Sequence, residues 1–244
     1  RKEVNGSELL EGESTTAEVF NTLDETANKT EEWVEKNQKV ILIAVGVIAL
    51  AVLAYLGFVN VIQEPKEKEA MSEMYQAQEY FDEALTSTIA KDSLYNLSLS
   101  GGNSKYGFLD IIENYGGTKA SNLSNYYAGV AYLNMNDYKN AISYLDAFES
   151  DDAVLGPLAK GAIGDAFVQL DQMDTALEYY ESAAKMQDNE FTTPRFLLKA
   201  GIAAMKLGNA SKAAAHFSSI TGMYSNTTEA SKAKAYLSQA EAMK

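Results

Sequence analysis

The side chains that most often carry chemistry are scarce in this chain and are not arranged for catalysis. The 244 residues include no cysteine and a single histidine, His216. Disulfides, thiolate metal sites and histidine clusters are therefore excluded. The adjacent carboxylates Asp151 and Asp152 could bind a cation, but they fall in a predicted turn, where such a pair is ordinarily solvated. His216 falls in a predicted helix beside Phe217, which favours a surface or interface role.

No sequence motif with a known catalytic mechanism occurs either. The chain has no glycine-rich phosphate loop, GxSxG nucleophile elbow, HExxH zinc motif or acidic calcium loop. We therefore expect no enzyme activity, no catalytic residue, no cofactor, no metal and no small-molecule substrate. The net charge of −14 argues against a nucleic-acid-binding surface. What remains is a protein that works through its surfaces.

One segment is apolar enough to cross a membrane. Residues 40–59 read VILIAVGVIALAVLAYLGFV, a run of twenty without a charge, an amide or a proline. At about 1.5 Å per residue, a helix of this length spans the roughly 30 Å hydrocarbon core. A buried core helix would keep a polar stripe, and a signal peptide would be shorter and nearer the N-terminus. We predict a transmembrane signal-anchor helix over 39–62, with Trp33, Tyr55 and Phe58 as interfacial aromatics.

The basic residues around this run indicate its orientation by a narrow margin. Lys36 and Lys39 precede it, and Lys66 and Lys68 follow it. Lys39 abuts the run directly, which favours a cytoplasmic N-terminus and a C-terminal part on the other side. Residues 1–16 are predicted to be a disordered acidic tail, and 17–38 an amphipathic juxtamembrane helix. That helix could contact a partner or simply be solvated.

A set of small and aromatic residues recurs three times after the span with the same spacing. Its members stand at relative positions 0, +3, +12, +16 and +19: Gly129, Tyr132, Ala141, Leu145 and Phe148; Gly164, Phe167, Ala176, Tyr180 and Ala183; Gly201, Ala204, Ala213, Phe217 and Ile220. The periods of 35 and 37 residues are near the 34 of a tetratricopeptide repeat. Small residues allow two helices to cross closely and larger ones fill the space beside the crossing, so this set is predicted to be scaffold.

These patterns predict an all-α fold, with one transmembrane helix followed by a tetratricopeptide-repeat superhelix. Three repeats are expected over 119–227, and a capping helix over 228–244. A degenerate first repeat is expected over 63–118, with a Ser- and Asn-rich loop at 91–105 inserted between its helices. The sequence Gln63-Glu64-Pro65-Lys66 is predicted to end the transmembrane helix.

The inner wall of a tetratricopeptide array is built from the first helix of each repeat, at offsets −6, −3, +1 and +4 from the glycine. Apart from Gly161, these positions hold our candidate partner-binding residues: Leu123, Tyr126, Val130, Leu133, Leu158, Asp165, Val168, Arg195, Leu198, Ile202 and Met205. This wall is less polar than walls that clamp phosphate or carboxylate, and it suits an amphipathic helix or an unfolded apolar segment. The alternative is that the chain's own N-terminal helix or C-terminal cap covers it.

The order of parts resembles the YfgM-type ancillary subunits of the bacterial Sec translocon. The likeness runs from about residue 31, with the anchor after EEWVEKNQK, then KEKEAMSEMYQAQEYFDEAL, then the repeats. It implies a single-pass inner-membrane protein with its N-terminus in the cytoplasm and its repeats in the periplasm. It also implies SecYEG and a PpiD-type anchored prolyl isomerase as partners, and a chaperone-like role in protein translocation.

A structural adaptor in another envelope complex is the alternative function, for example in outer-membrane assembly, gliding, secretion or division. The abundance of Asn, Tyr and Lys is typical of a Bacteroidota-like source. Neither the translocon subunit nor the adaptor in another envelope complex implies a catalytic or cofactor-binding residue.

Overall fold

The computed structural model describes residues 11–244, and the side chains of residues 31 and 33–244. The chain divides into two compact units, with the boundary between Ile62 and Gln63. The described residues form an all-α fold, with one isolated β-bridge between Gly102 and Lys105. The helices are α1 (Glu11–Phe58), the π-helix η1 (Val59–Gln63), α2 (Glu64–Thr86), α3 (Lys91–Ser100), α4 (Phe108–Asn114), α5 (Lys119–Asn134), α6 (Tyr138–Ala147), α7 (Leu155–Gln169), α8 (Met173–Met186), α9 (Thr193–Lys206), α10 (Ala210–Met223) and α11 (Thr228–Ala242).

The N-terminal helical segments follow one another without a break. Helix α1 begins at Glu11, so the prediction of disorder is wrong for 11–16, while residues 1–10 lie outside the described part. The predicted stop at 63–66 is also wrong, because η1 joins α1 directly to α2. Pro65 lies in the first turn of α2, directly after η1, and it has no N–H to donate to the preceding helical turn. This helical stretch includes a segment long and apolar enough to cross a membrane, and none of that segment is buried among the described residues.

The segment predicted to be an irregular insert contains a helix. Helix α3 buries Tyr95, Ser98 and Leu99, which lie on one face at helical spacing. The Ser and Asn residues of this segment make its buried face difficult to recognise from the sequence. Of the predicted loop, only the part that falls in 101–107 is non-helical. Helix α2 packs mainly against α3 and to a smaller extent against α4, and α4 packs mainly on α5.

The first turn of α2 is attached to the start of the repeats by side-chain hydrogen bonds. The carboxylate of Glu67 accepts from the backbone N–H groups of Lys119 (2.7 Å) and Ala120 (3.0 Å) at the N-terminus of α5. The Lys66 ammonium donates to the Gly116 carbonyl at 3.0 Å. An acid at a helix N-terminus and a cation on free carbonyls are both favourable arrangements. The repeat unit thus begins from a fixed α2.

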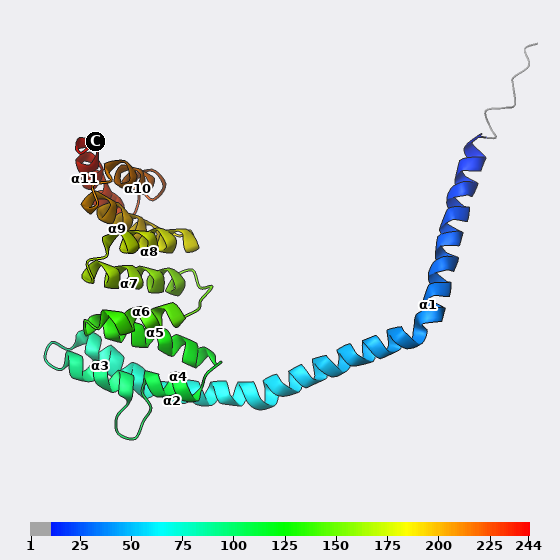
Figure 1. Cartoon of the computed structure of the whole chain (residues 1–244), viewed down its shortest axis with the longest axis horizontal. Helices are drawn as coiled ribbons and strands as arrows, with labels where there is room; N and C mark the ends of the chain where they lie inside the picture. The colour runs from blue at the N-terminus through cyan, green and yellow to red at the C-terminus, as the bar shows by residue number, and fades with distance from the viewer. Residues whose placement is uncertain (1–10) are drawn as a thin grey trace, which may run out of the picture. The chain divides into compact units, whose positions relative to one another are not determined.

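The three repeats pair α5 with α6, α7 with α8, and α9 with α10, and α11 packs on the last pair (Figure 1). The turns inside the pairs are equivalent. Each contains one residue with positive φ, namely Asn136 (63°), Asp171 (59°) and Gly208 (75°). In each turn this residue donates its N–H to the carbonyl three residues earlier, and the next residue donates to the carbonyl five residues earlier. This Schellman arrangement ends one helix and directs the chain into the next.

The repeat glycines lie where helices cross closely. A Cβ atom added to Gly129 would lie 2.5 Å from Cγ of Leu145, and one added to Gly164 would lie 2.6 Å from the Tyr180 ring. Gly201 meets the Phe217 ring in the same way. These partners are the +16 residues of the sequence pattern. The scaffold role predicted for the glycines and for the +16 residues is confirmed.

A buried hydroxyl in the first bundle leads to a stability prediction. Tyr95 is fully buried, and within the described part of the chain its hydroxyl has no hydrogen-bond partner. A buried unsatisfied polar group costs about 1–3 kcal/mol. We expect Tyr95→Phe to raise the free energy of unfolding by about 1 kcal/mol, measured by urea denaturation of the detergent-solubilised chain.

Tyr224→Phe is the matched control, because the Tyr224 hydroxyl donates to Asp188 at 2.5 Å. This control should lower the free energy of unfolding by about 1 kcal/mol. A Tyr95→Phe variant that loses as much stability as Tyr224→Phe would show that the Tyr95 hydroxyl is satisfied.

Candidate binding site on the first helices of the repeats

The candidate wall residues lie on α5, α7 and α9 as expected, but stacking of the repeats uses much of their surface. Leu123, Tyr126 and Val130 pack against the buried cluster that contains Leu145 and Ile163. Leu158, Val168, Ile202 and Met205 pack against the cluster formed by α8 to α11. Leu198 is buried, with 8 % of its surface exposed, whereas Arg195 is exposed. The wall is therefore a half-buried surface and not an open apolar groove.

Two adjacent hollows bring four of the candidates together. The first, of about 330 Å³, is lined by Leu133, Asn136, Tyr138, Asp165, Val168, Gln169 and Tyr180. The second, of about 130 Å³, is lined by Val168, Met173, Tyr180, Lys199, Ile202, Ala203 and Lys206. They share Val168 and Tyr180, so we call them the paired hollow. It spans all three repeats at the ends of their first helices.

The centre of the paired hollow is polar. The Tyr180 hydroxyl donates to Oδ1 of Asp165 at 2.6 Å, and the Lys199 ammonium donates to both oxygens of Asp165 at 2.5 and 2.7 Å. The ammonium also lies 5.5 Å from the centre of the Tyr180 ring. Burial, and then the charge of Asp165, raise the pKa of Tyr180. The phenol thus stays protonated as a fixed donor, and the cluster joins α7, α8 and α9.

Sequence reasoning missed the polar partners in this hollow. The repeat pattern assigns Tyr180 to packing alone, and the glycine offsets do not include Lys199. Asp165 is at +1 from its glycine and Lys199 at −2 from the next one. Opposite charges on the facing sides of two consecutive first helices are a signal that could have found the pair.

A second polar cluster joins the second and third repeats. Glu181 on α8 lies 3.0 Å from the Lys212 ammonium and 2.8 Å from Nε2 of His216, both on α10. Partial burial alone raises the pKa of Glu181, but the hydrogen bonds and charges of Lys212 and His216 outweigh it and place this pKa below its ordinary value of 4.5. His216 is therefore a contact between repeats.

The lowered pKa of Glu181 predicts a pH-dependent contribution to stability. A depressed carboxyl pKa stabilises the fold above the unfolded value and loses this effect as the pH falls through the folded value. We expect Glu181→Gln to lower the free energy of unfolding by about 1 kcal/mol near pH 7 and by less near pH 3. Urea titrations at both pH values measure the difference, and Glu178→Gln, an exposed site on α8, is the control. An equal loss at both pH values would contradict the assignment.

Comparison with known proteins identifies the class of the repeats. Residues 124–151 match the tetratricopeptide repeat family, and this stretch covers most of α5, all of α6 and the following turn. Neither a curated protein nor a solved structure matches the chain. With the equivalent turns and glycine crossings, the match supports a protein of the tetratricopeptide type. Arrays of this kind mediate protein–protein interactions and are typically non-enzymatic scaffolds.

Proposed function

We propose that this protein is a membrane-anchored tetratricopeptide scaffold that serves the bacterial Sec translocon. The observation that carries the proposal is the combination of one helix long and apolar enough to span a membrane with a repeat array just after it. Residues 40–59 contain no charged or amide side chain and no Ser or Thr, so this span acts as a tether and has no features of a transport path.

The paired hollow and the wall around it are the proposed partner-binding surface. Leu133, Val168 and Ile202 offer apolar contacts, while Asp165, Lys199 and Lys206 offer hydrogen bonds and charge. This mixture suits an amphipathic protein segment. The proposed partners are SecYEG and a PpiD-type anchored prolyl isomerase, and the proposed role is to assist exported chains as they leave the translocon.

The proposed location is the bacterial inner membrane, crossed once, with the N-terminus in the cytoplasm and the repeats in the periplasm. Its support is Lys39 directly before the apolar run and the resemblance in order of parts. Protease added to cells with a permeabilised outer membrane should digest the repeats. Digestion only after rupture of the inner membrane would reverse the orientation.

Pull-down of the tagged full chain in mild detergent tests the function. We expect recovery of Sec subunits or of an anchored isomerase, and at least a severalfold loss of recovery in a Val168→Thr, Ile202→Thr variant. Both replacements keep the branched shape but add a hydroxyl to the apolar contact. Ile89→Thr is the control, since Ile89 is 98 % exposed and lies outside the hollow. Recovery of neither partner would refute the Sec assignment.

A further inference from the structure

The turns that lead from one repeat to the next form a continuous edge. Asn122 donates to the Glu149 carbonyl (2.7 Å) and accepts from the Glu149 N–H (3.0 Å). Farther along, Asn189 donates to the Ala153 carbonyl at 2.9 Å, and Tyr224 donates to Asp188 at 2.5 Å. Each turn is thus hydrogen-bonded to its neighbour, on the side of the repeats that faces right in Figure 1. We call residues 148–154, 186–192 and 223–229 the inter-repeat edge.

Four large apolar side chains are exposed on this edge, whereas the apolar residues of the wall predicted from sequence are buried or half-buried. Phe191 is 58 % exposed, Met223 67 %, Met186 38 % and Val154 36 %. The turns that carry Val154, Met186 and Phe191 are adjacent, because Met186 Cε lies against Gly156 and Asn189 donates to the Ala153 carbonyl. Large apolar side chains gathered on one exposed surface are typical of an interaction site.

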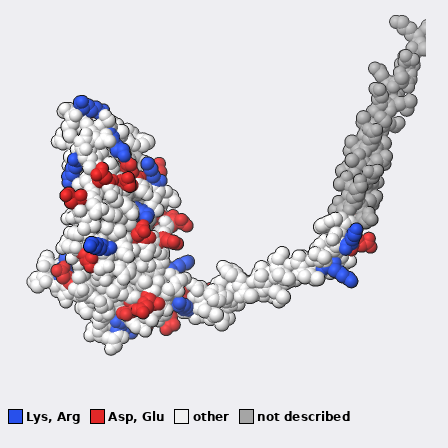
Figure 2. Space-filling view, in the orientation of Figure 1, with Lys and Arg blue, Asp and Glu red and all other residues white. Residues whose placement is uncertain are grey.

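The charges on the same edge have a single sign. Its segments contain Glu149, Asp151, Asp152, Asp188, Glu190 and Glu229, and no Lys or Arg. Figure 2 shows acidic side chains on this side of the repeats, with Lys and Arg side chains from outside these segments among them. Asp152 accepts from two backbone N–H groups at the start of α7, and Asp188 accepts from Tyr224. Glu149, Asp151 and Glu190 are exposed.

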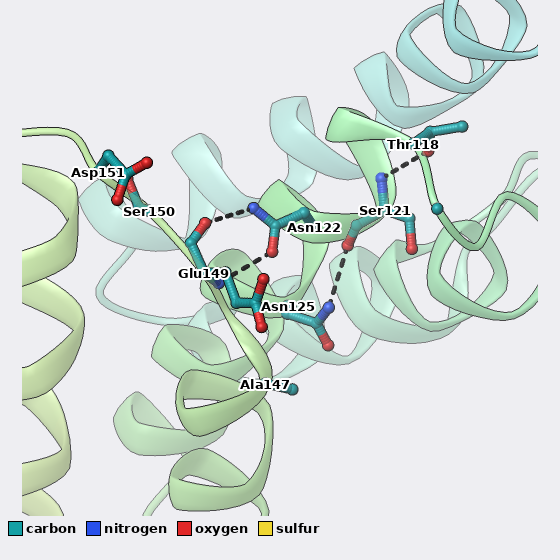
Figure 3. A pocket seen from close by; sticks show the side chains of 9 residues that line it. Thr118, Ser121, Asn122, Asn125, Ala147, Glu149, Ser150 and Asp151 are labelled. Atoms are coloured by element: carbon teal, nitrogen blue, oxygen red, sulfur yellow. Dashed lines mark hydrogen bonds between the residues drawn. The ribbon is translucent and has the colours of Figure 1, made fainter. Parts of the chain in front are cut away.

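A polar hollow of about 550 Å³ lies at the α5 end of the edge. Gly117, Thr118, Ser121, Asn122, Asn125, Ala147, Glu149, Ser150 and Asp151 line it (Figure 3). The side chain of Asn122 is used in holding the Glu149 backbone, whereas the carboxylates of Glu149 and Asp151 remain at the surface. No cationic side chain lines this hollow.

We propose that the inter-repeat edge is a second docking surface, for a protein segment that carries both Lys or Arg and apolar side chains. The cationic groups bind at Glu149, Asp151 and Glu190, and the apolar groups cover Val154, Met186 and Phe191. The charge of the edge selects this partner, since an anionic lipid surface or a nucleic acid would be repelled. The surface is separate from the paired hollow and does not depend on the Sec assignment.

Binding of a defined peptide to the full chain in phosphatidylcholine nanodiscs tests this inference. The probe is a fluorescent peptide of repeated Lys-Phe-Ser units, with a Glu-Phe-Ser peptide as its acidic counterpart and empty nanodiscs as the blank. We expect binding of the Lys peptide only, weakened by salt. Hydrogen exchange should slow on peptide binding at 148–154 and 186–192, and stay unchanged at the turns inside the repeats.

Two variants separate the contributions of charge and apolar surface. Asp151→Lys with Glu190→Lys should weaken peptide binding about tenfold, and Phe191→Ser should weaken it severalfold. The control pair, Glu178→Lys with Ile89→Ser, changes one exposed acid and one exposed apolar residue away from the edge and should bind as the unchanged chain does. Equal binding of both peptides, or unchanged binding by the charge-reversed variant, would overturn the proposal. Slowed exchange at the edge on anionic phosphatidylglycerol discs without peptide would assign the edge to the membrane surface instead.

Discussion

Gly161→Ala is expected to destabilise the repeat array by about 3 kcal/mol, although it adds one methyl group. A Cβ atom at Gly161 would fall within the ring of Phe196 on the next repeat. Phe196 is 2 % exposed, and its ring cannot move without displacing the surrounding core. For a unit of this size the loss corresponds to a fall of roughly 6–12 °C in the thermal midpoint. Urea and thermal denaturation followed by circular dichroism measure it.

Gly222→Ala is the matched control for this substitution. Gly222 also lies in a helix, α10, but a Cβ atom there would meet nothing within 4 Å. Because alanine favours the helix more than glycine, we expect Gly222→Ala to stabilise the chain by about 0.5–1 kcal/mol. Equal effects of the two substitutions would show that α7 and α9 do not approach as closely as the structure indicates.

Replacement of Val47 and Leu50 by arginine is expected to abolish membrane integration. Both residues lie near the middle of the apolar run, and both side chains are exposed. Each replacement costs about 3–4 kcal/mol on insertion scales, so the pair costs about 6–8 kcal/mol. The chain should move from the membrane pellet to the soluble fraction on alkaline carbonate extraction.

The control exchanges the two apolar residues, Val47→Leu with Leu50→Val, and should remain in the pellet. This variant keeps the composition of the span and introduces no charge. If the arginine variant also resisted extraction, the run would not be the membrane anchor.

The repeats could be predicted from sequence because their geometry constrains residue type at fixed spacing. A close helix crossing requires a glycine in the first helix of each repeat. Each of the three turns requires a residue that tolerates positive φ, and Asn136, Asp171 and Gly208 occupy these positions. These constraints are local and recur, so they are visible without a structure.

Two local signals were misleading because tertiary context decided the outcome. The Ser- and Asn-rich residues after Lys91 suggested a loop, yet burial of Tyr95 and Leu99 against α2 and its neighbours makes them a helix. Pro65 suggested a helix end, but a proline in a first turn is compatible with a helix that follows a π-turn.

The candidate site could be predicted only in part. Offsets from the glycine place side chains on the correct helices, but they do not tell how much of each side chain the next repeat covers. Leu198 shows the difference, since its burial means that Leu198→Glu would test folding and not binding. Lys199, one residue later, reaches Asp165 across the repeat boundary, and that contact depends on how the helices stack.

Site-specific photo-crosslinking in native membranes tests the central claim most directly. A photoreactive residue at Gln169 or Lys206 stands at an exposed position that lines the paired hollow, and Glu178 provides the control position on α8. The account predicts adducts with a Sec subunit or an anchored prolyl isomerase from Gln169 and Lys206, and few from Glu178. No adduct from the hollow positions, or equal adducts from all three, would contradict the claim that this array is a translocon scaffold that binds through its paired hollow.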